Sequence, residues 1–421
     1  MGHSFRKRVV ITGVGLVTPA GATLQRYWES ITSGRSVLRT ITLVDTSDLR
    51  ISLAGEVDNS FFAEEDRPCW PDNQLDRTDR ALLLCRSATR RALIDADVCL
   101  EPQMPLPIGI SLGSGGGPCQ ATEEAYLAYA RSGPRGARPK TVTRLMFNSI
   151  SAQIAICFKL RGPQMTLASA CASANMAMSR AVDLIRSGSI KQMVTGGVEM
   201  PLCRTVISAW AAMRVCSNAT DKEQCSLPFH KRRAGLALAE GSAMFVFEEL
   251  ESALSRGARI YAEVLGYGEN NDGTHITQPD ANSQAEAIVQ ALRDADLKPE
   301  DIDYINAHGT GTELNDSCET EAIKRAFGHM APRVPISSTK SVLGHGLGAS
   351  GALELPAILG AFENQLLPPT ANLDEIDPRC DLDYVPCSPR RAQVGKAISN
   401  SFAFGGANSV LVLGRCAPSS P

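Results

Sequence analysis

Residues 164–197 read QMTLASACASANMAMSRAVDLIRSGSIKQMVTGG, a pattern that predicts a strand, a helix and a second strand. The first strand covers 164–168, the helix 172–187 and the second strand 193–197. Apolar residues recur at i, i+3, i+4 and i+7 on one helix face: Met178, Ala181, Val182 and Ile185. Gly188 supplies the helix stop. The turn between the first strand and the helix carries Cys171 among serine and alanine residues.

The same alternation of strands and helices extends along the chain. Further strands are predicted over 8–15, 108–112, 242–248, 260–266 and 302–306, and further helices over 79–96 and 283–295. Residues 397–413 are predicted to form two strands joined by a turn at Gly405-Gly406. Asp316 and Glu319 predict a helix start of the capping-box type. Strands interleaved with helices indicate an α/β fold in which helices cover the sheets.

Bulk properties limit the class of protein. A chain of 421 residues predicts two domains or one large duplicated domain, and a weak change of composition near 255–257 divides it. A net charge of -3 gives no electrostatic reason to expect nucleic acid or a membrane as a partner. The basic cluster at 6–8 runs directly into a strand, so it does not resemble a signal peptide.

Cysteine usage indicates a reducing compartment. The thirteen cysteines are scattered, and no Cys-x-x-Cys pair occurs, so we expect no metal site of the zinc-knuckle type. Their odd number suits free thiols, as in a soluble cytoplasmic protein.

Cys171 is the candidate nucleophile. A cysteine attacks as a thiolate, and a helix N-terminus lowers the pKa of a thiol through its unpaired N–H groups. Small neighbours leave room for a bulky acyl thioester. The alternative for Cys171 alone is a buried structural cysteine, and the two interpretations are about equally supported without the histidines described next.

Two histidines lie in small-residue stretches, AHGTGT at 307–312 and KSVLGHG at 340–346. His308 follows a predicted strand, and open α/β sheets bind ligands at the carboxyl ends of their strands. Taken singly, His308 and His345 could each be structural. Together, two neutral imidazoles can donate N–H groups to a thioester oxygen and stabilise an enolate. Lys340 can orient or electrostatically bias the pair.

The chain resembles the β-ketoacyl-acyl-carrier-protein synthases (ketosynthases) of the elongating type. The resemblance rests on the stretches above and on VVITG at 9–13, LRGP at 160–163, PPTANL at 368–373 and NSFAFGG at 400–406. It implies a thiolase-like fold, duplicated in five layers (α-β-α-β-α), and usually a dimer. Residues 1–255 would form the half with the nucleophilic cysteine and 256–421 the half with both histidines.

The resemblance also implies residue roles. Cys171 becomes the acylated nucleophile, His308 and His345 the decarboxylation and condensation pair, and Lys340 the charged residue beside them. The N–H groups of Cys171 and Phe404 would form the oxyanion hole, with Phe404 as a gate. The remaining positions are the pantetheine contacts Thr310 and Thr312 and the supporting acids Glu319 and Glu354.

The implied reaction is ping-pong condensation of an acyl thioester with malonyl-acyl-carrier protein, in fatty-acid-like or type II polyketide or polyene biosynthesis. No cofactor is expected to be bound permanently, and the phosphopantetheine arm of a separate acyl-carrier protein would deliver the substrates. The partner subunit would be a second copy or a ketosynthase-like chain.

Three alternatives are weighed against this interpretation. Thiolases need a C-terminal cysteine before x-Gly, whereas Cys416 precedes Ala417-Pro418. Initiating synthases carry asparagine where this chain has His345. A non-catalytic partner subunit of the chain-length-factor type lacks the cysteine found at position 171.

The sequence departs from the family at two places. The stretch PFHKRRAGL at 228–236 replaces a run that usually reads Pro-Phe-Asp-x-x-Arg-Asp-Gly-Phe. Gly116 stands where a bulkier pocket residue is common, which predicts an enlarged acyl tunnel. Arg138 and Lys140 are candidates for docking an acidic carrier protein near the tunnel mouth, and ordinary solvated surface positions are an equally supported alternative for both.

Overall fold

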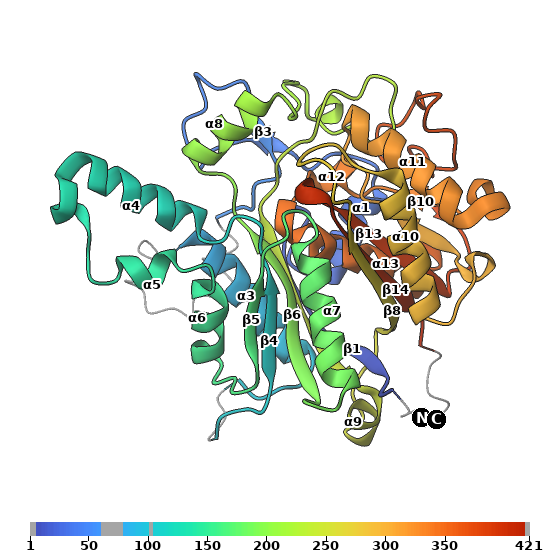
Figure 1. Cartoon of the computed structure of the whole chain (residues 1–421), viewed down its shortest axis with the longest axis horizontal. Coiled ribbons are helices and arrows are strands. Elements are labelled where there is room, and N and C mark those ends of the chain that lie inside the picture. The colour runs from blue at the N-terminus through green and yellow to red at the C-terminus, as the bar shows by residue number, and fades with distance from the viewer. Residues whose placement is uncertain (1–5, 60–78, 101–103, 417–421) are drawn as a thin grey trace.

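A ten-stranded mixed sheet organises the computed structural model, which describes residues 6–59, 79–100 and 104–416 (Figure 1). Its strand order is β10-β9-β13-β14-β8-β1-β7-β6-β4-β5. In chain order the strands are β1 (Val9–Val17), β4 (Gly109–Gly113), β5 (Gln164–Leu167), β6 (Gln192–Glu199), β7 (Gly241–Glu249), β8 (Ala262–Asn271), β9 (Tyr304–Asn306), β10 (Ile336–Ser337), β13 (Lys396–Phe402) and β14 (Ala407–Gly414). Two small ribbons pair β2 (Arg39–Thr40) with β3 (Leu53–Ala54) and β11 (Leu366–Leu367) with β12 (Arg390–Arg391).

The sheet repeats itself about its middle. Outward from β1, the pairings to β7 and then β6 are antiparallel, and those to β4 and then β5 are parallel. Outward from β8, the pairings to β14 and then β13 are antiparallel, and those to β9 and then β10 are parallel. The two halves therefore share one topology, and β1 joins β8 at the centre. This is the duplication that the family resemblance implies.

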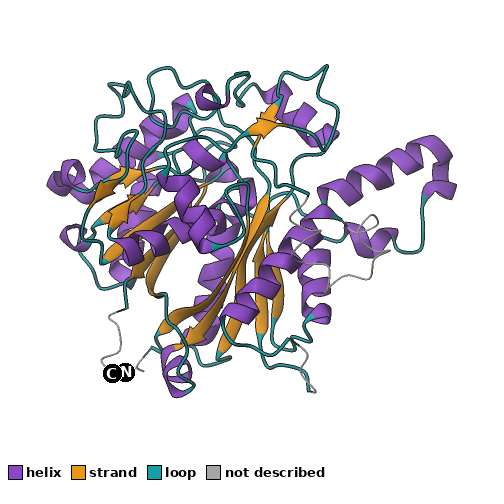
Figure 2. Cartoon of the chain, turned by 180° about the vertical axis from the view of Figure 1, so that it is seen from behind, coloured by secondary structure: helices purple, strands orange, loops and turns teal. Residues whose placement is uncertain are grey.

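Helices form layers between and outside the two groups of strands (Figure 2). The inner helices α7 (Ser173–Arg186) and α13 (Ser350–Asn364) touch each other and strands of both halves. Helix α3 (Arg80–Asp95) covers β1 and β7, and α6 (Ser149–Cys157) packs beside it. Helix α10 (Ala281–Asp294) covers β8 and β14, and α11 (Glu313–Phe327) packs beside it. The result is the predicted α-β-α-β-α order.

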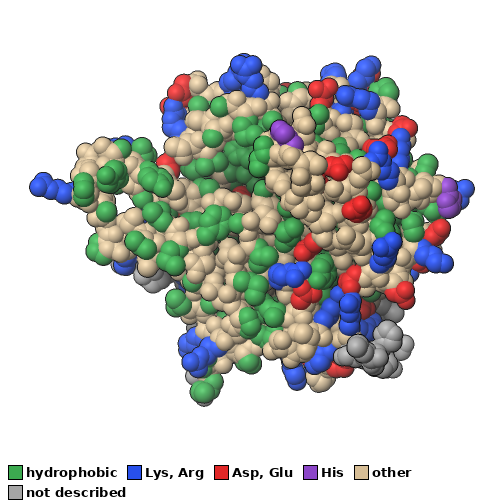
Figure 3. Space-filling view, in the orientation of Figure 1, with side chains coloured by type: hydrophobic (Ala, Val, Ile, Leu, Met, Phe, Trp, Pro, Cys, Tyr) green, Lys and Arg blue, Asp and Glu red, His purple; other side chains and the backbone are tan. Residues whose placement is uncertain are grey.

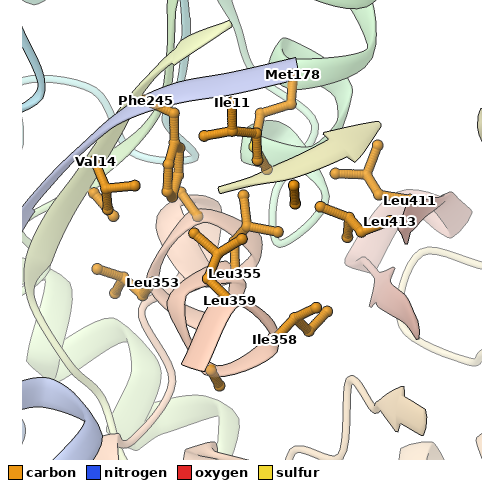
Figure 4. Close-up of a cluster of buried hydrophobic side chains, with 14 of the residues drawn as sticks. Ile11, Val14, Met178, Phe245, Leu353, Leu355, Ile358, Leu359, Leu411 and Leu413 are labelled. Atoms are coloured by element: carbon orange, nitrogen blue, oxygen red, sulfur yellow. The ribbon is translucent and has the colours of Figure 1, made fainter. Parts of the chain in front are cut away.

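The inner helices are buried because the core surrounds them. Figure 4 shows Leu353, Leu355 and Leu359 of α13 facing Phe245 of β7 and Met178 of α7. The predicted apolar face of α7 is completely buried. Such a helix is held by tertiary packing more than by its own propensity.

The remaining helices are short or peripheral. They are α1 (Leu24–Thr32), α4 (Cys119–Ser132), α5 (Thr141–Leu145), α8 (Arg204–Met213), α9 (Leu250–Ser255) and α12 (Lys340–Leu343), with 3-10 turns η3 (Gly133–Gly136), η4 (Lys222–Gln224), η5 (Pro299–Asp301), η6 (Gly328–Arg333), η7 (Leu347–Ala349) and η8 (Phe404–Gly406). Within the described residues, none of the helices has the length and apolar character needed to span a bilayer.

One predicted helix start is wrong. Helix α11 begins at Glu313, where the Thr312 hydroxyl accepts the N–H of Asn315 as the N-cap. Asp316 and Glu319 do not cap this helix, because their carboxylates are buried and bind the preceding loop.

Candidate active site

Three loops bring Cys171, His308 and His345 together. The Cys171 sulfur and one ring nitrogen of each histidine lie within 4.8 Å of one another, and the three side chains are buried. The imidazole centroids are 5.3 Å apart, and the rings meet edge to face at 81°. Cys171 precedes α7 after β5, and His345 precedes α13 after β10, so the duplication places them at equivalent connections.

The turn before α7 presents Cys171. Ala170 adopts φ of 44°, a left-handed conformation that costs energy for a residue with a Cβ. The Ser173 hydroxyl closes the turn by accepting the N–H of Ser169 (2.8 Å) and donating to the carbonyl of Ala170 (2.6 Å). The cysteine therefore lies at the helix N-terminus, where the sequence predicts it.

Burial opposes the thiolate form predicted for Cys171. Burial raises the pKa of the Cys171 thiol to about 12. The field of Lys340 and N–H groups of Phe404 and Cys171 lower that pKa, but by less. Desolvation of a sulfur anion thus outweighs the stabilisation expected from the helix N-terminus. Cys171 is a neutral thiol at pH 7.

Hydrogen bonds fix the proton of His345. The N–H of Leu347 can only donate, and it points at His345 Nδ1 (3.2 Å). The Ser350 hydroxyl lies 2.7 Å from the same nitrogen. Burial and the Lys340 charge hold the pKa of His345 well below its usual range. His345 is therefore neutral, with its proton on Nε2.

His308 is neutral for the same reasons. Burial, Lys340 and His345 all lower its pKa. Glu319 holds its loop by accepting the N–H groups of His308 (2.8 Å) and Gly309 (2.7 Å). Asp316 accepts those of Thr310 and Gly311. Two inward carboxylates of α11 thus shape the loop that carries the histidine.

A buried ion pair joins Lys340 and Glu354. Burial raises the pKa of Glu354 to about 7, although Lys340 opposes that rise. The positive charge of Lys340 lowers the pKa of Cys171, His308 and His345. A sulfur and two imidazole nitrogens are ligand types that zinc accepts. The same positive charge, however, disfavours a cation among them, so the arrangement suits a developing anion better.

The three reactive side chains line a cavity of about 340 Å³. Thr310, Thr312 and Phe404 line it as well, and the two threonine hydroxyls are 2.9 Å apart. The Phe404 ring stacks on Trp210 with centroids 6.0 Å apart. The N–H groups of Phe404 and Cys171 lie close enough to the Cys171 sulfur to lower the pKa of its thiol.

Gly116 does not open into this cavity. Its N–H binds Glu199 at 2.9 Å, and a Cβ at Gly116 would lie 2.5 Å from Cys119 Sγ. Cys119 Sγ therefore lies close to this glycine. The enlarged or unusual acyl tunnel at Gly116 stays a prediction.

Glu199 is the buried carboxylate that sequence reasoning missed. It ends β6, and burial raises its pKa to about 7. The available signal was an acid at the end of a buried strand, two residues after the pair Gly196-Gly197.

Three side chains of the unusual stretch 228–236 pair with acidic side chains of 374–377. His230 binds Asp374 (2.6 Å), Lys231 binds Glu375 (2.7 Å) and Arg233 binds Asp377 (2.5 Å). Buried Arg233 also donates to the carbonyls of Thr312 and Glu313 at the cavity wall. Although the stretch 228–236 departs from the family motif, its Arg233 still supports the cavity wall.

Arg138 and Lys140 lie away from the cavity lining. They are exposed in the loop between η3 and α5. Charged residues that do line the cavity include Arg214, Arg233, Asp272 and Glu313.

Comparisons with known proteins agree with this fold. The family model described as Beta-ketoacyl synthase, N-terminal domain, matches residues 6–253, and the C-terminal domain model matches 261–374. The chain is 40% identical to a 3-oxoacyl-[acyl-carrier-protein] synthase 2 of Synechocystis sp. (strain PCC 6803), covering 98% of this chain and 99% of that protein.

Solved ketosynthase structures have the same fold as this chain. The ishigamide ketosynthase/chain length factor superposes with a TM-score of 0.90 at 35% identity, covering 98% of this chain and 100% of that one. A type II polyketide ketosynthase, solved with its acyl-carrier protein and bound to the hexaketide, superposes with a TM-score of 0.89 at 29% identity over 98% and 100% of the two chains. This chain belongs to the β-ketoacyl synthase family and is an enzyme of that kind.

Proposed function

We propose that this chain catalyses the decarboxylative Claisen condensation of an acyl thioester with malonyl-acyl-carrier protein. The product is a 3-oxoacyl-carrier protein, in fatty-acid-like or type II polyketide or polyene biosynthesis. The observation that carries the proposal is the meeting of one thiol and two neutral imidazoles within 4.8 Å in one cavity.

In the first half-reaction the Cys171 sulfur attacks the acyl carbonyl. A sulfur–carbon bond forms, the bond to the carrier sulfur breaks, and the proton of the Cys171 thiol leaves with the carrier thiol. The N–H groups of Cys171 and Phe404 stabilise the oxyanion. Phe404 lies over the cysteine as a gate, and Thr310 and Thr312 hold the phosphopantetheine arm.

In the second half-reaction malonyl-carrier protein binds beside the acyl-enzyme. The Nε2–H of His345 and the His308 imidazole stabilise the enolate oxygen as carbon dioxide leaves. The enolate carbon then attacks the acyl carbonyl and displaces the Cys171 sulfur as a thiolate, which takes up a proton from solvent. Burial and Lys340, which is held by its ion pair with Glu354, keep both imidazoles neutral, and Glu319 holds the His308 loop.

Mass spectrometry after incubation with acyl-loaded carrier protein tests this function. We expect one acyl adduct on Cys171, no adduct in Cys171→Ala, and a 3-oxoacyl product once malonyl-carrier protein is added. Absence of an adduct in the wild-type protein would instead favour a non-catalytic, chain-length-factor-like subunit.

The chain is further proposed to pair with a second ketosynthase-fold chain, a copy of itself or a ketosynthase-like partner. Strand β5 is a sheet edge with half-exposed residues, and an unpaired edge is a template for another chain. The adjacent arm of α4 and α5 projects from the body at the left of Figure 1. Along α4 only Ala121 is buried, and the arm exposes Tyr126, Leu127, Tyr129, Val142, Met146 and Phe147 (Figure 3).

Analytical ultracentrifugation tests the pairing. Tyr126→Glu with Val142→Glu should shift the chain toward a monomer, because a charge cannot be buried unpaired in an interface. Ile94→Glu, at an exposed apolar position of α3, is the matched control and should not. A wild-type monomer that acquires no partner in the presence of ketosynthase-like chains would contradict the proposal.

We also propose that residues 1–255 and 256–421 are the two halves of the duplication. The repeated strand order and the family matches to 6–253 and 261–374 support this division. Cysteines such as Cys171, Cys203 and Cys225 are free thiols, which supports a reducing, cytoplasmic location.

A further inference from the structure

Glu199 joins two loops that come from opposite halves of the molecule. Its side chain is buried at the end of β6. One carboxylate oxygen accepts the N–H groups of Gly115 (2.7 Å) and Gly348 (2.9 Å), and the other accepts that of Gly116 (2.9 Å). A single carboxylate thus binds the loop after β4 and the loop that leads into α13.

The Gly348 side of this contact bears on His345. The residue before Gly348 is Leu347, and the N–H of Leu347 donates to His345 Nδ1. Leu347 has φ of 43°, a left-handed conformation that a leucine adopts only when its surroundings hold it there. The Glu199 hydrogen bond to the next N–H supplies such a hold.

The Gly115 side bears on Cys171. The two loops touch backbone to backbone, since a Cβ at Gly348 would lie 2.0 Å from the nitrogen of Gly115. A Cβ at Gly115 would in turn lie 3.4 Å from the carbonyl oxygen of Ala170, the residue before the cysteine. Glu199 is therefore bound directly behind the nucleophile and one of its two histidines.

We infer that Glu199 is a positioning residue that fixes the tautomer and orientation of His345 through Gly348 and Leu347. The inference rests on the proposed function, because it assigns the His345 Nε2–H to the malonyl half-reaction. With the carboxylate in place, the Leu347 N–H occupies Nδ1 and the ring presents Nε2–H to the cavity. Without it, the strained turn relaxes and Nδ1 loses a donor.

The expected effect is selective for one half-reaction. Loss of a residue that orients a reacting group typically costs about 10- to 100-fold in activity. Malonyl decarboxylation should fall by that factor in Glu199→Gln, where an amide NH2 replaces one acceptor oxygen. Reaction of Cys171 with iodoacetamide should not slow, because removing the negative charge lowers the pKa of this thiol.

Two further variants separate positioning from charge and from stability. Glu199→Asp keeps the charge but is one methylene shorter and cannot reach both loops, so it should also lose decarboxylation. Glu248→Gln is the matched control: this buried carboxylate lies on neighbouring β7, opposite Gln192 at the other end of β6, and pairs with Arg256. It should lower both half-reactions together, or neither.

The measurements are carbon dioxide release from malonyl-loaded carrier protein, alkylation of Cys171 followed by mass spectrometry, and melting temperature. Selective loss of decarboxylation in both Glu199 variants supports the inference. Wild-type decarboxylation in a folded variant, or parallel loss of both reactions, overturns it. A wild-type protein that neither acylates Cys171 nor releases carbon dioxide would contradict the proposed function itself.

A measurement on the wild-type protein covers the case in which the variants do not fold. Nitrogen NMR of ring-labelled histidine should show His345 neutral with its proton on Nε2, the signal being assigned by its loss in His345→Asn. A proton on Nδ1 would overturn the inference without any Glu199 variant.

Discussion

At the scale of single residues, burial determines the chemistry of the site more than local dipoles do. The position of Cys171 at a helix N-terminus was predictable from the pattern at 164–197, because small residues and helical periodicity are local signals. Its protonation state was not, since the depth of burial depends on β5, α7 and the histidine loops folding together. The same desolvation keeps His308 and His345 uncharged.

The raised pKa of Cys171 predicts an unusual alkylation profile. Because only the thiolate reacts and its pKa is about 12, the iodoacetamide rate should rise about tenfold per pH unit from pH 7 to 10. An ordinary cysteine peptide levels off above a pKa of about 8.5 and serves as the control. Mass spectrometry of the Cys171 peptide isolates its rate from those of the other cysteines. A plateau near pH 7 would mean that the thiolate is stabilised after all.

At the scale of elements, long-range contacts account for what the sequence did not predict. Asp316 and Glu319 have the spacing of a capping box, yet both turn inward to bind the loop before their helix. Glu199 lies 149 residues from Gly348, so no local pattern could reveal that contact. Periodic segments such as α7 were predicted correctly because one buried face suffices to define them.

The side-chain pairs between 230–233 and 374–377 should contribute unequally to the melting temperature, because one pair is buried and another is exposed. Asp377→Asn removes the nearer of two carboxylates beside buried Arg233, the other being Asp316 at 3.7 Å, so the melting temperature should fall by several degrees. Arg233 also supports Thr312 and Glu313. Glu375→Gln breaks an exposed pair with Lys231 and should leave the melting temperature unchanged. Equal melting temperatures for the two variants would show that Arg233 does not depend on Asp377.

At the scale of the whole molecule, the duplicated sheet explains how distant motifs meet. Equivalent connections, β5 to α7 and β10 to α13, carry Cys171 and His345 to the same cavity. In each half a buried carboxylate also accepts two consecutive N–H groups of the loop after an equivalent strand: Glu199 after β4 and Glu319 after β9. The family motifs predicted this fold, whereas the paired carboxylates emerged only from the structure.

Keeping two imidazoles neutral has a cost for the stability of the whole fold. Below pH 6.5 the unfolded chain protonates both histidines while the folded chain does not, so the free energy of unfolding decreases as the pH falls. At pH 5 this amounts to at most about 2 kcal/mol for each ring. The double variant His308→Asn, His345→Asn lacks both groups, so its free energy of unfolding should rise relative to that of the wild type between pH 8 and pH 5, by at most about 4 kcal/mol. Glu199 and Glu354, whose raised pKa values act in the opposite direction, are present in both proteins and cancel in the difference. Urea unfolding of the two proteins at both pH values measures this difference, and a constant offset would mean that the imidazoles take up protons in the folded state.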